Sequence, residues 1–180
     1  MLRAKVRPRL SSLLGLGGIG IYRQSQESRC HNVPESTRAM SWDIFVQDLP
    51  KTAGTVEEIP DDFTPRPIGK RMLMVEKIRQ IVPTADFSDP SWGRIHGENW
   101  SIEIDMGKDE ECSGFCFHVR GSDAAAGVVA AILEELELRA LDPAHETGFF
   151  TGGPDAVEAF RRWRAYRDQV ARLDPKSSPR

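Results

Sequence analysis

The side chains best suited to chemistry gather on two neighbouring stretches, Ser101–Met106 and Gly114–Arg120. Each stretch alternates apolar and polar residues, which is the pattern of a half-buried strand. The polar connection Gly107–Glu111 joins them, so we expect an antiparallel hairpin whose polar sides lie on one face of a sheet. That face would carry Glu103, Asp105, Cys116, His118 and Arg120.

A carboxylate, an imidazole and a guanidinium held together can perform general acid–base chemistry. Depending on the register of the hairpin, Glu103 lies across from Cys116 or from His118. Candidate catalytic residues are therefore Glu103, His118 and Arg120, with Cys116 as a further candidate nucleophile that would need His118 as its base. Charged residues on the solvated or partner-covered face of an antiparallel sheet give the same pattern without catalysis. The second interpretation is preferred, and it favours a protein that is not an enzyme.

Metal and cofactor chemistry lacks its usual sequence signals. Cys112, Cys116 and His118 offer three potential ligands, which we place on one face of one strand, but zinc needs four converging ligands and no second short-spaced pair is evident. The sequence contains no G-x-S-x-G, H-E-x-x-H or P-loop pattern. We expect no metal and no cofactor. Gly121–Asp123 stands before a predicted helix, where Asp123 would repel an anion, so we expect Ser122 or Asp123 to cap that helix.

Hydrophobic periodicity predicts the elements that position this face. Further strands are predicted at Ser41–Asp48, at Trp92–His96 and shortly before Phe150. Helices are predicted at Lys70–Val82, directly after Asp123 and at Asp155–Leu173. Thr84–Gly97 opens with residues typical of a turn, and Lys51–Gly69 is predicted to be a long loop. This order predicts an α+β fold, a two-layer sandwich of a mainly antiparallel sheet with helices packed on one face.

Composition suggests three parts along the chain. Residues 1–39 combine a basic start with a short, glycine-broken apolar run, and a second methionine, Met40, directly precedes the first strand. We interpret 1–39 as a disordered tail or a misassigned start, with a targeting peptide as the alternative. The α+β domain is predicted at 40–150, and 151–180 is predicted to be a C-terminal helical extension.

Charge and cysteine content indicate the kind of partner and compartment. Residues 1–39 carry a net charge of +5 and residues 40–180 a net charge of −8, which together give the −3 of the whole chain. An acidic body disfavours nucleic acid and favours a protein with a basic surface. No apolar run is long enough for a membrane span. Three cysteines without a disulfide framework suit the cytoplasm. The oligomeric state is left open.

Three segments carry a resemblance to known sequences: Ser41–Pro50, Asp86–Gly93 and Phe117–Gly121. They resemble a group of short, uncharacterised bacterial proteins that open with the Ser41–Pro50 strand. The resemblance covers Met40 to about Phe150 and agrees with a natural start at Met40. It implies no activity, because that group has none assigned. The sequence therefore predicts a small acidic interaction domain, with an acid–base enzyme as the alternative.

Overall fold

The computed structural model describes residues 41–173, with side chains described as far as residue 169. The disordered tail or misassigned start predicted at 1–39 falls outside these residues. Residues 60–64 lie outside the compact unit that carries the fold. Among the described residues, no helix is long and apolar enough to cross a lipid bilayer.

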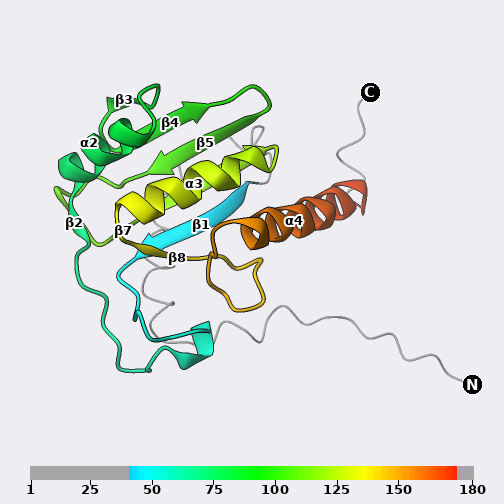
Figure 1. Cartoon of the computed structure of the whole chain (residues 1–180), viewed down its shortest axis with the longest axis horizontal. Coiled ribbons are helices and arrows are strands. Elements are labelled where there is room, and N and C mark those ends of the chain that lie inside the picture. Colours follow the sequence, from blue (N-terminus) through cyan, green and yellow to red (C-terminus); the bar gives the residue numbers. More distant parts are fainter. Residues whose placement is uncertain (1–40, 174–180) are drawn as a thin grey trace, which may run out of the picture. The chain divides into compact units, whose positions relative to one another are not determined.

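Six strands form one sheet in the order β3-β4-β5-β7-β1-β8, and every neighbouring pair is antiparallel (Figure 1). The strands are β1 (Trp42–Gln47), β3 (Asp86–Asp89), β4 (Trp92–His96), β5 (Trp100–Asp105), β7 (Gly114–Gly121) and β8 (Arg139–Leu141). A separate two-stranded pair joins β2 (Gly69–Lys70) to β6 (Glu111–Cys112). The antiparallel sheet predicted from alternation is confirmed.

Within the described residues, three α-helices complete the fold: α2 (Arg71–Ile81), α3 (Ala124–Glu135) and α4 (Pro154–Leu173). A 3-10 turn, η2 (Val56–Glu58), interrupts the long loop after β1. Figure 1 shows α3 lying across the sheet, and α3 contacts β5 and β7 as well as both other helices. The fold is therefore an α+β sandwich with its helices packed against the sheet, as the sequence predicts.

Alternation along the strands builds the core between sheet and helices. On β1, Trp42 and Ile44 point to the same face and pair in register with Val119 and Phe117 of β7. Ile102 and Ile104 extend this face on β5. All of these side chains are at most 1% exposed. Full burial of one such side chain stabilises the fold by about 1.5–3 kcal/mol, so this face holds the sheet to its helices.

Helix α4 reaches the same core through aromatic side chains. Phe160 is fully buried and stacks on Trp42 of β1, with ring centroids 4.8 Å apart. Trp163 then stacks on Phe160 at 5.7 Å and is half-buried. Val157, Phe160 and Trp163 thus lie on the face of α4 that contacts the core. The segment predicted as an extension contributes side chains to the core of the sheet.

The opposite sheet face is partly covered as well. A second apolar cluster contains Leu49, Ala53, Leu141 and Phe149, and Phe45 of β1 packs against it. Arg139 of β8 donates hydrogen bonds to the carbonyl oxygens of Pro50 and Ala53. Its guanidinium also lies 4.1 Å from the centre of the Phe149 ring. Residues 49–59 therefore cover the β1–β8 end of this face and leave its middle to the polar residues.

The turn predicted at the start of Thr84–Gly97 is replaced by an edge strand. Asp86–Asp89 form β3, which pairs with β4 through an irregular register. The turn-forming chemistry is nevertheless present, because Asp86 accepts a hydrogen bond from the amide of Ser88 and Asp89 accepts one from the amide of Ser91. The bond from Ser88 holds the pKa of Asp86 below its usual value, and hydrogen bonds from the hydroxyl and the amide of Ser91 do the same for Asp89. Side-chain-to-backbone bonds and strand pairing coexist here because β3 is the outermost strand.

Candidate functional site

The polar residues of three central strands lie in one row across the second sheet face. Antiparallel register places Glu103 of β5 directly across from His118 of β7, and His118 directly across from Asp43 of β1. Arg94 of β4 continues the row beside Glu103. Of the two registers that the sequence allows, the one with Glu103 opposite His118 is observed. Cys116 instead lies across from Asp105.

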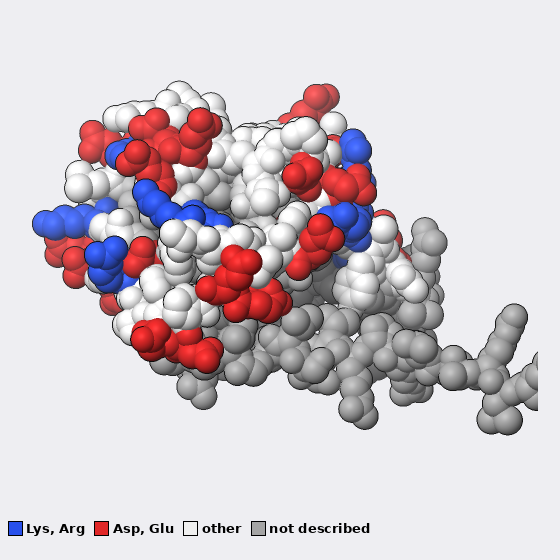
Figure 2. Space-filling model, turned by 60° about the horizontal axis from the view of Figure 1, so that its bottom comes forward, with Lys and Arg blue, Asp and Glu red and all other residues white. Residues whose placement is uncertain are grey.

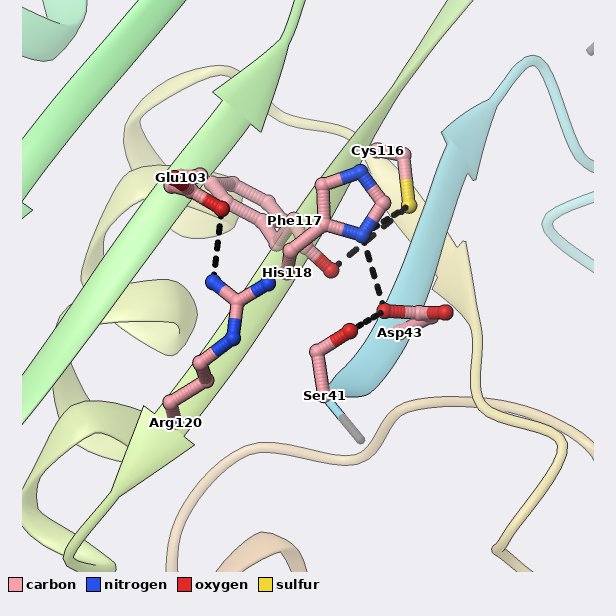
Figure 3. Close-up of polar contacts among 7 residues, drawn as sticks. All are labelled: Ser41, Asp43, Glu103, Cys116, Phe117, His118 and Arg120. Atoms are coloured by element: carbon pink, nitrogen blue, oxygen red, sulfur yellow. Dashed lines mark hydrogen bonds and ion pairs between the residues drawn. The ribbon is translucent and has the colours of Figure 1, made fainter. Parts of the chain in front are cut away.

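His118 is bound by Asp43, a residue that the sequence-based choice of candidates omitted. The distance from His118 Nδ1 to Asp43 Oδ1 is 2.8 Å, and the His118 side chain is 19% exposed (Figure 3). An ionised carboxylate can only accept hydrogen bonds, so Nδ1 of His118 carries the proton. In the neutral ring, Nε2 is then the hydrogen-bond acceptor. The alternation of β1 puts Asp43 on the polar face, but its contact with His118 requires β1 to pair with β7, which the sequence did not reveal.

Two further side chains fix the Asp43–His118 pair. Ser41 Oγ donates a hydrogen bond to Asp43 Oδ1 at 2.6 Å. The indole of Trp92 from β4 stacks beside the imidazole, with ring centroids 5.9 Å apart and planes at 23°. The imidazole is thus oriented by a carboxylate and flanked by an aromatic ring. Such an arrangement restricts which way Nε2 points.

Glu103 and Arg120 form a separate ion pair. Arg120 Nη1 donates to Glu103 Oε2 at 2.6 Å, and each side chain is 31% exposed. Glu103 therefore neutralises Arg120, although it faces His118 in register. Figure 3 shows the Glu103–Arg120 contact on one side of His118 and the Asp43 contact on the other. The three candidate catalytic residues lie close together but divide into two pairs.

Cys116 is a poor candidate nucleophile. Its side chain is only 2% exposed, so a substrate in solvent cannot readily reach the sulfur. Its Sγ lies 3.9 Å from His118 Nδ1, the same nitrogen that binds Asp43 at the shorter distance. Sγ also lies 3.6 Å from the carbonyl oxygen of Phe117. Because Nδ1 donates its N–H in the hydrogen bond to Asp43, it has no lone pair with which to act as a base toward the thiol.

The placement of Cys112, Cys116 and His118 on one face of one strand is wrong. Cys112 ends β6 and belongs to the core cluster under the helices, whereas Cys116 lies on β7 beside His118. The strand is interrupted at Ser113, between β6 and β7, and β6 pairs with β2 instead of extending β7. Burial raises the pKa of the Cys112 thiol. Within residues 41–173, no cluster of three or more His, Cys, Asp or Glu side chains could hold a metal ion.

The start of α3 also differs from the sequence-based expectation. Asp123 is the N-cap residue of α3, yet no side-chain capping bond is present there. Its backbone is already helical, which directs the carboxylate away from the first-turn amides. Asp123 Oδ2 instead pairs with Arg161 of α4 at 2.9 Å. The carboxylate thus links two helices.

A buried carboxyl that contacts the helix-covered core was not found from the sequence. Asp142 follows β8 and is 0% exposed. Its Oδ1 accepts hydrogen bonds from Trp42 Nε1 and from the amide of Ala144, both at 2.9 Å, while Oδ2 has no partner. Burial raises the pKa of Asp142, although these hydrogen bonds oppose the rise. Its Asp-Pro sequence suggests only a turn, so nothing local marks it as buried.

Comparison of the chain with models of protein families, with curated proteins and with solved structures found no match.

Proposed function

We propose that this domain is a non-enzymatic interaction module that binds a protein with a basic surface. The division of the sheet-face residues into the Glu103–Arg120 ion pair and the Asp43–His118 hydrogen bond carries the proposal. Glu103 binds Arg120 and His118 binds Asp43, so carboxylate, imidazole and guanidinium do not converge on a common point where a substrate would react. Paired charges of this kind are what cross-strand neighbours form on a sheet face that serves structure or docking.

The excess of acidic side chains supports the choice of partner. Residues 40–180 carry a net charge of −8, and exposed acids outnumber exposed bases among the described residues. Figure 2 shows several groups of acidic side chains on the face turned toward the viewer, with basic side chains between them. A surface of this sign attracts a basic protein over distances of about a Debye length and repels nucleic acid.

A pull-down from the native host with the tagged full chain tests the proposal. We expect a specific protein partner whose binding weakens as salt is raised from low to physiological concentration, because screening reduces attraction between exposed charges. The test variant replaces exposed acids by their amides, for example Glu110→Gln with Glu111→Gln. Loss of the partner in this variant supports the proposal. Absence of any partner, or binding unchanged by salt, contradicts it.

An acid–base enzyme is the second candidate function, and one contact favours it. The 2.8 Å bond from Asp43 to His118 orients an imidazole with Nε2 as its acceptor, which is how a carboxylate prepares a general base. Asp43 then takes the role that the sequence assigned to Glu103. Hydrolysis of any substrate in a panel of chromogenic esters and phosphates, abolished by His118→Ala and retained by His96→Ala, would favour this function over docking.

A further inference from the structure

The peptide bond between Asp142 and Pro143 joins two groups that can react with each other. An aspartate carboxyl closes a five-membered ring when it attacks the carbonyl carbon of its own residue, and an attack within one residue is strongly favoured over one between molecules. The amide nitrogen of proline is tertiary, which makes it a better leaving group once it is protonated. The sequence has three such pairs, Asp89–Pro90, Asp142–Pro143 and Asp174–Pro175, and the last lies outside the described residues.

The surroundings of Asp142 keep its carboxyl buried and one of its oxygens free. The side chain is 0% exposed, in the turn that leads from β8 toward α4 (Figure 1). Oδ1 accepts hydrogen bonds from Trp42 Nε1 and the Ala144 amide, whereas Oδ2 has no hydrogen-bond partner among the described residues. In the neutral carboxyl the proton therefore belongs on Oδ2, because Oδ1 already accepts two donors.

Burial also helps the carboxyl to keep that proton. It raises the pKa of Asp142, although the hydrogen bonds to Oδ1 oppose the rise. The positive charges that act on this carboxyl come from His145 of the same turn and from Arg162 of α4, and both lower the pKa by less than burial raises it. Asp142 thus stays protonated at a higher pH than an exposed aspartate does.

The carbonyl group of the same peptide bond is polarised by the turn. The carbonyl oxygen of Asp142 accepts a hydrogen bond from the His145 amide at 3.0 Å, and the Asp142 amide donates to the carbonyl oxygen of Gly148 at 2.9 Å. An N–H aimed at a carbonyl oxygen stabilises the negative charge that develops there when the carbon is attacked. Pro143 is exposed, so water can reach the bond once it has opened.

The Asp89–Pro90 pair has the same two residue types in the opposite surroundings. Asp89 is exposed, and its Oδ1 accepts hydrogen bonds from the hydroxyl and the amide of Ser91 at 2.7 and 2.8 Å. These bonds lower the pKa of Asp89. Its carboxylate has lost its proton at a pH at which Asp142 still holds one, so it has none to give to the Pro90 nitrogen. The two pairs therefore separate the effect of the fold from that of the sequence.

We propose that Asp142–Pro143 is a self-cleavage site, at which the chain cuts itself into 1–142 and 143–180. Oδ2 attacks the carbonyl carbon of Asp142, and the C–N bond to Pro143 breaks with its electron pair left on the nitrogen. The carboxyl proton passes to that nitrogen. The cyclic anhydride that remains takes up one water, which leaves Asp142 with a terminal carboxyl and Pro143 with a free amine. This activity goes beyond the proposed interaction function and does not depend on it.

The cut leaves the fold assembled. The fragment 143–180 carries α4, and Phe160 of α4 is fully buried and stacks on Trp42 of β1. Burial of such a side chain holds the two fragments together without a covalent bond. Cleavage is therefore visible as two fragments only after the protein has been denatured.

Intact mass spectrometry of the purified full chain tests the proposal. The chain is incubated with protease inhibitors at mildly acidic and at neutral pH, then denatured and weighed. We expect fragments 1–142 and 143–180, the second with Pro143 at its amino terminus, formed faster at the lower pH. The rate does not depend on protein concentration, because the reaction is intramolecular. Cleavage at Asp142–Pro143 is at least about tenfold faster than at Asp89–Pro90 in the same molecules.

Urea provides a comparison that needs no variant. In the unfolded chain the contacts of both aspartates are lost, so cleavage at Asp142–Pro143 slows to within about threefold of that at Asp89–Pro90. Pro143→Ala keeps the carboxyl but makes the leaving nitrogen a secondary amide, and we expect cleavage at least about tenfold slower. The matched control Asp89→Asn leaves cleavage at Asp142–Pro143 unchanged. Thermal unfolding checks that both variants fold.

Four results would overturn the inference. They are a folded chain that stays intact at both pH values, equal rates at Asp142–Pro143 and Asp89–Pro90 in the folded protein, faster cleavage at Asp142–Pro143 in urea, and a Pro143→Ala chain that is cut as fast as the original. A rate that rises with protein concentration would likewise show that one molecule cuts another.

Discussion

The indole N–H of Trp42 donates a hydrogen bond to Asp142 Oδ1 at 2.9 Å, which joins β1 to a residue 100 positions later in the chain. Asp142 also binds the amide of Ala144, so one oxygen organises the turn after β8. The other oxygen is buried without a partner. The contact therefore fixes the position of Trp42 in the core and also leaves an ionisable group inside the protein.

Asp142 makes stability depend on pH. Burial raises the pKa of Asp142 in the folded state above the usual value of an aspartate, so the folded protein binds the proton more tightly than the unfolded chain. The contribution of Asp142 to the free energy of unfolding is thus greatest below about pH 4 and is lost as pH rises from there through the folded pKa. Asp142→Asn removes this contribution, and we expect a flatter pH profile in urea unfolding between acidic and neutral pH.

The hydrogen bond itself is tested by Asp142→Ala. This change removes the acceptor of a buried indole N–H, which costs about 1–3 kcal/mol at neutral pH, partly offset by removal of the buried charge. Asp155→Asn, on the exposed first turn of α4, serves as the control. An unaltered pH profile in Asp142→Asn would show that the carboxyl stays ionised without penalty.

Phe160 connects α4 to the sheet. The side chain is fully buried and stacks on Trp42, so Phe160→Ala removes a large core group and lowers the free energy of unfolding by about 3–5 kcal/mol. Tyr166→Ala on the exposed side of the helix changes it by less than about 0.5 kcal/mol. Chemical denaturation measures both. Deleting 155–180 should have an effect at least as large as Phe160→Ala, and equal stability of the truncated chain would mean that α4 is dispensable.

Gly121 ends β7 in a conformation that other residues rarely adopt. Its φ is +95°, and a Cβ added there would lie 2.2 Å from the carbonyl oxygen of Asn99. Gly121→Ala therefore strains the backbone and destabilises the protein by about 1–3 kcal/mol. Gly127 in α3 is a matched control with nothing within 4 Å of its Cβ position, and Gly127→Ala stabilises by about 0.5–1 kcal/mol. Opposite signs in thermal unfolding are the expected result.

The orientation of His118 can be read by ¹⁵N NMR of its ring. We expect the tautomer protonated at Nδ1, because Asp43 accepts that proton. Asp43→Ala removes the acceptor and shifts the population toward the tautomer protonated at Nε2. Glu103→Gln leaves the population as it is, since Glu103 binds Arg120. An equal response to both changes would mean that His118 is shared between the two carboxylates.

Strict alternation made the central fold predictable. The strands that contain Ile44, Ile102 and Phe117 carry one apolar face each, so their type and their inward residues follow from the residues alone. The hydrophobic periodicity of Asp155–Leu173 likewise predicted helix α4. These signals are local, and burial on one side is enough to produce them.

Contacts between strands that are far apart in the sequence could not be predicted from hydrophobic alternation. The pairing of β1 with β7 brings Asp43 to His118, and the turn after β8 brings Asp142 to Trp42. Neither residue differs locally from a surface aspartate. Cys112 shows the converse error, because a break at Ser113 ended the alternation that placed it beside Cys116. These contacts depend on the order of the strands in the sheet and on where strands are interrupted. The spacing of hydrophobic residues gives no information on either.

The two edge strands of the sheet limit aggregation between copies of this chain. On β3, the carboxylates of Asp86 and Asp89 bind the backbone amides of Ser88 and Ser91, and at the other border Phe149 bridges to Leu141 of β8. Both borders are short, and one is charged, so neither offers a long ladder of free amides and carbonyls to an incoming strand. Growth of the sheet by edge-to-edge aggregation is therefore disfavoured.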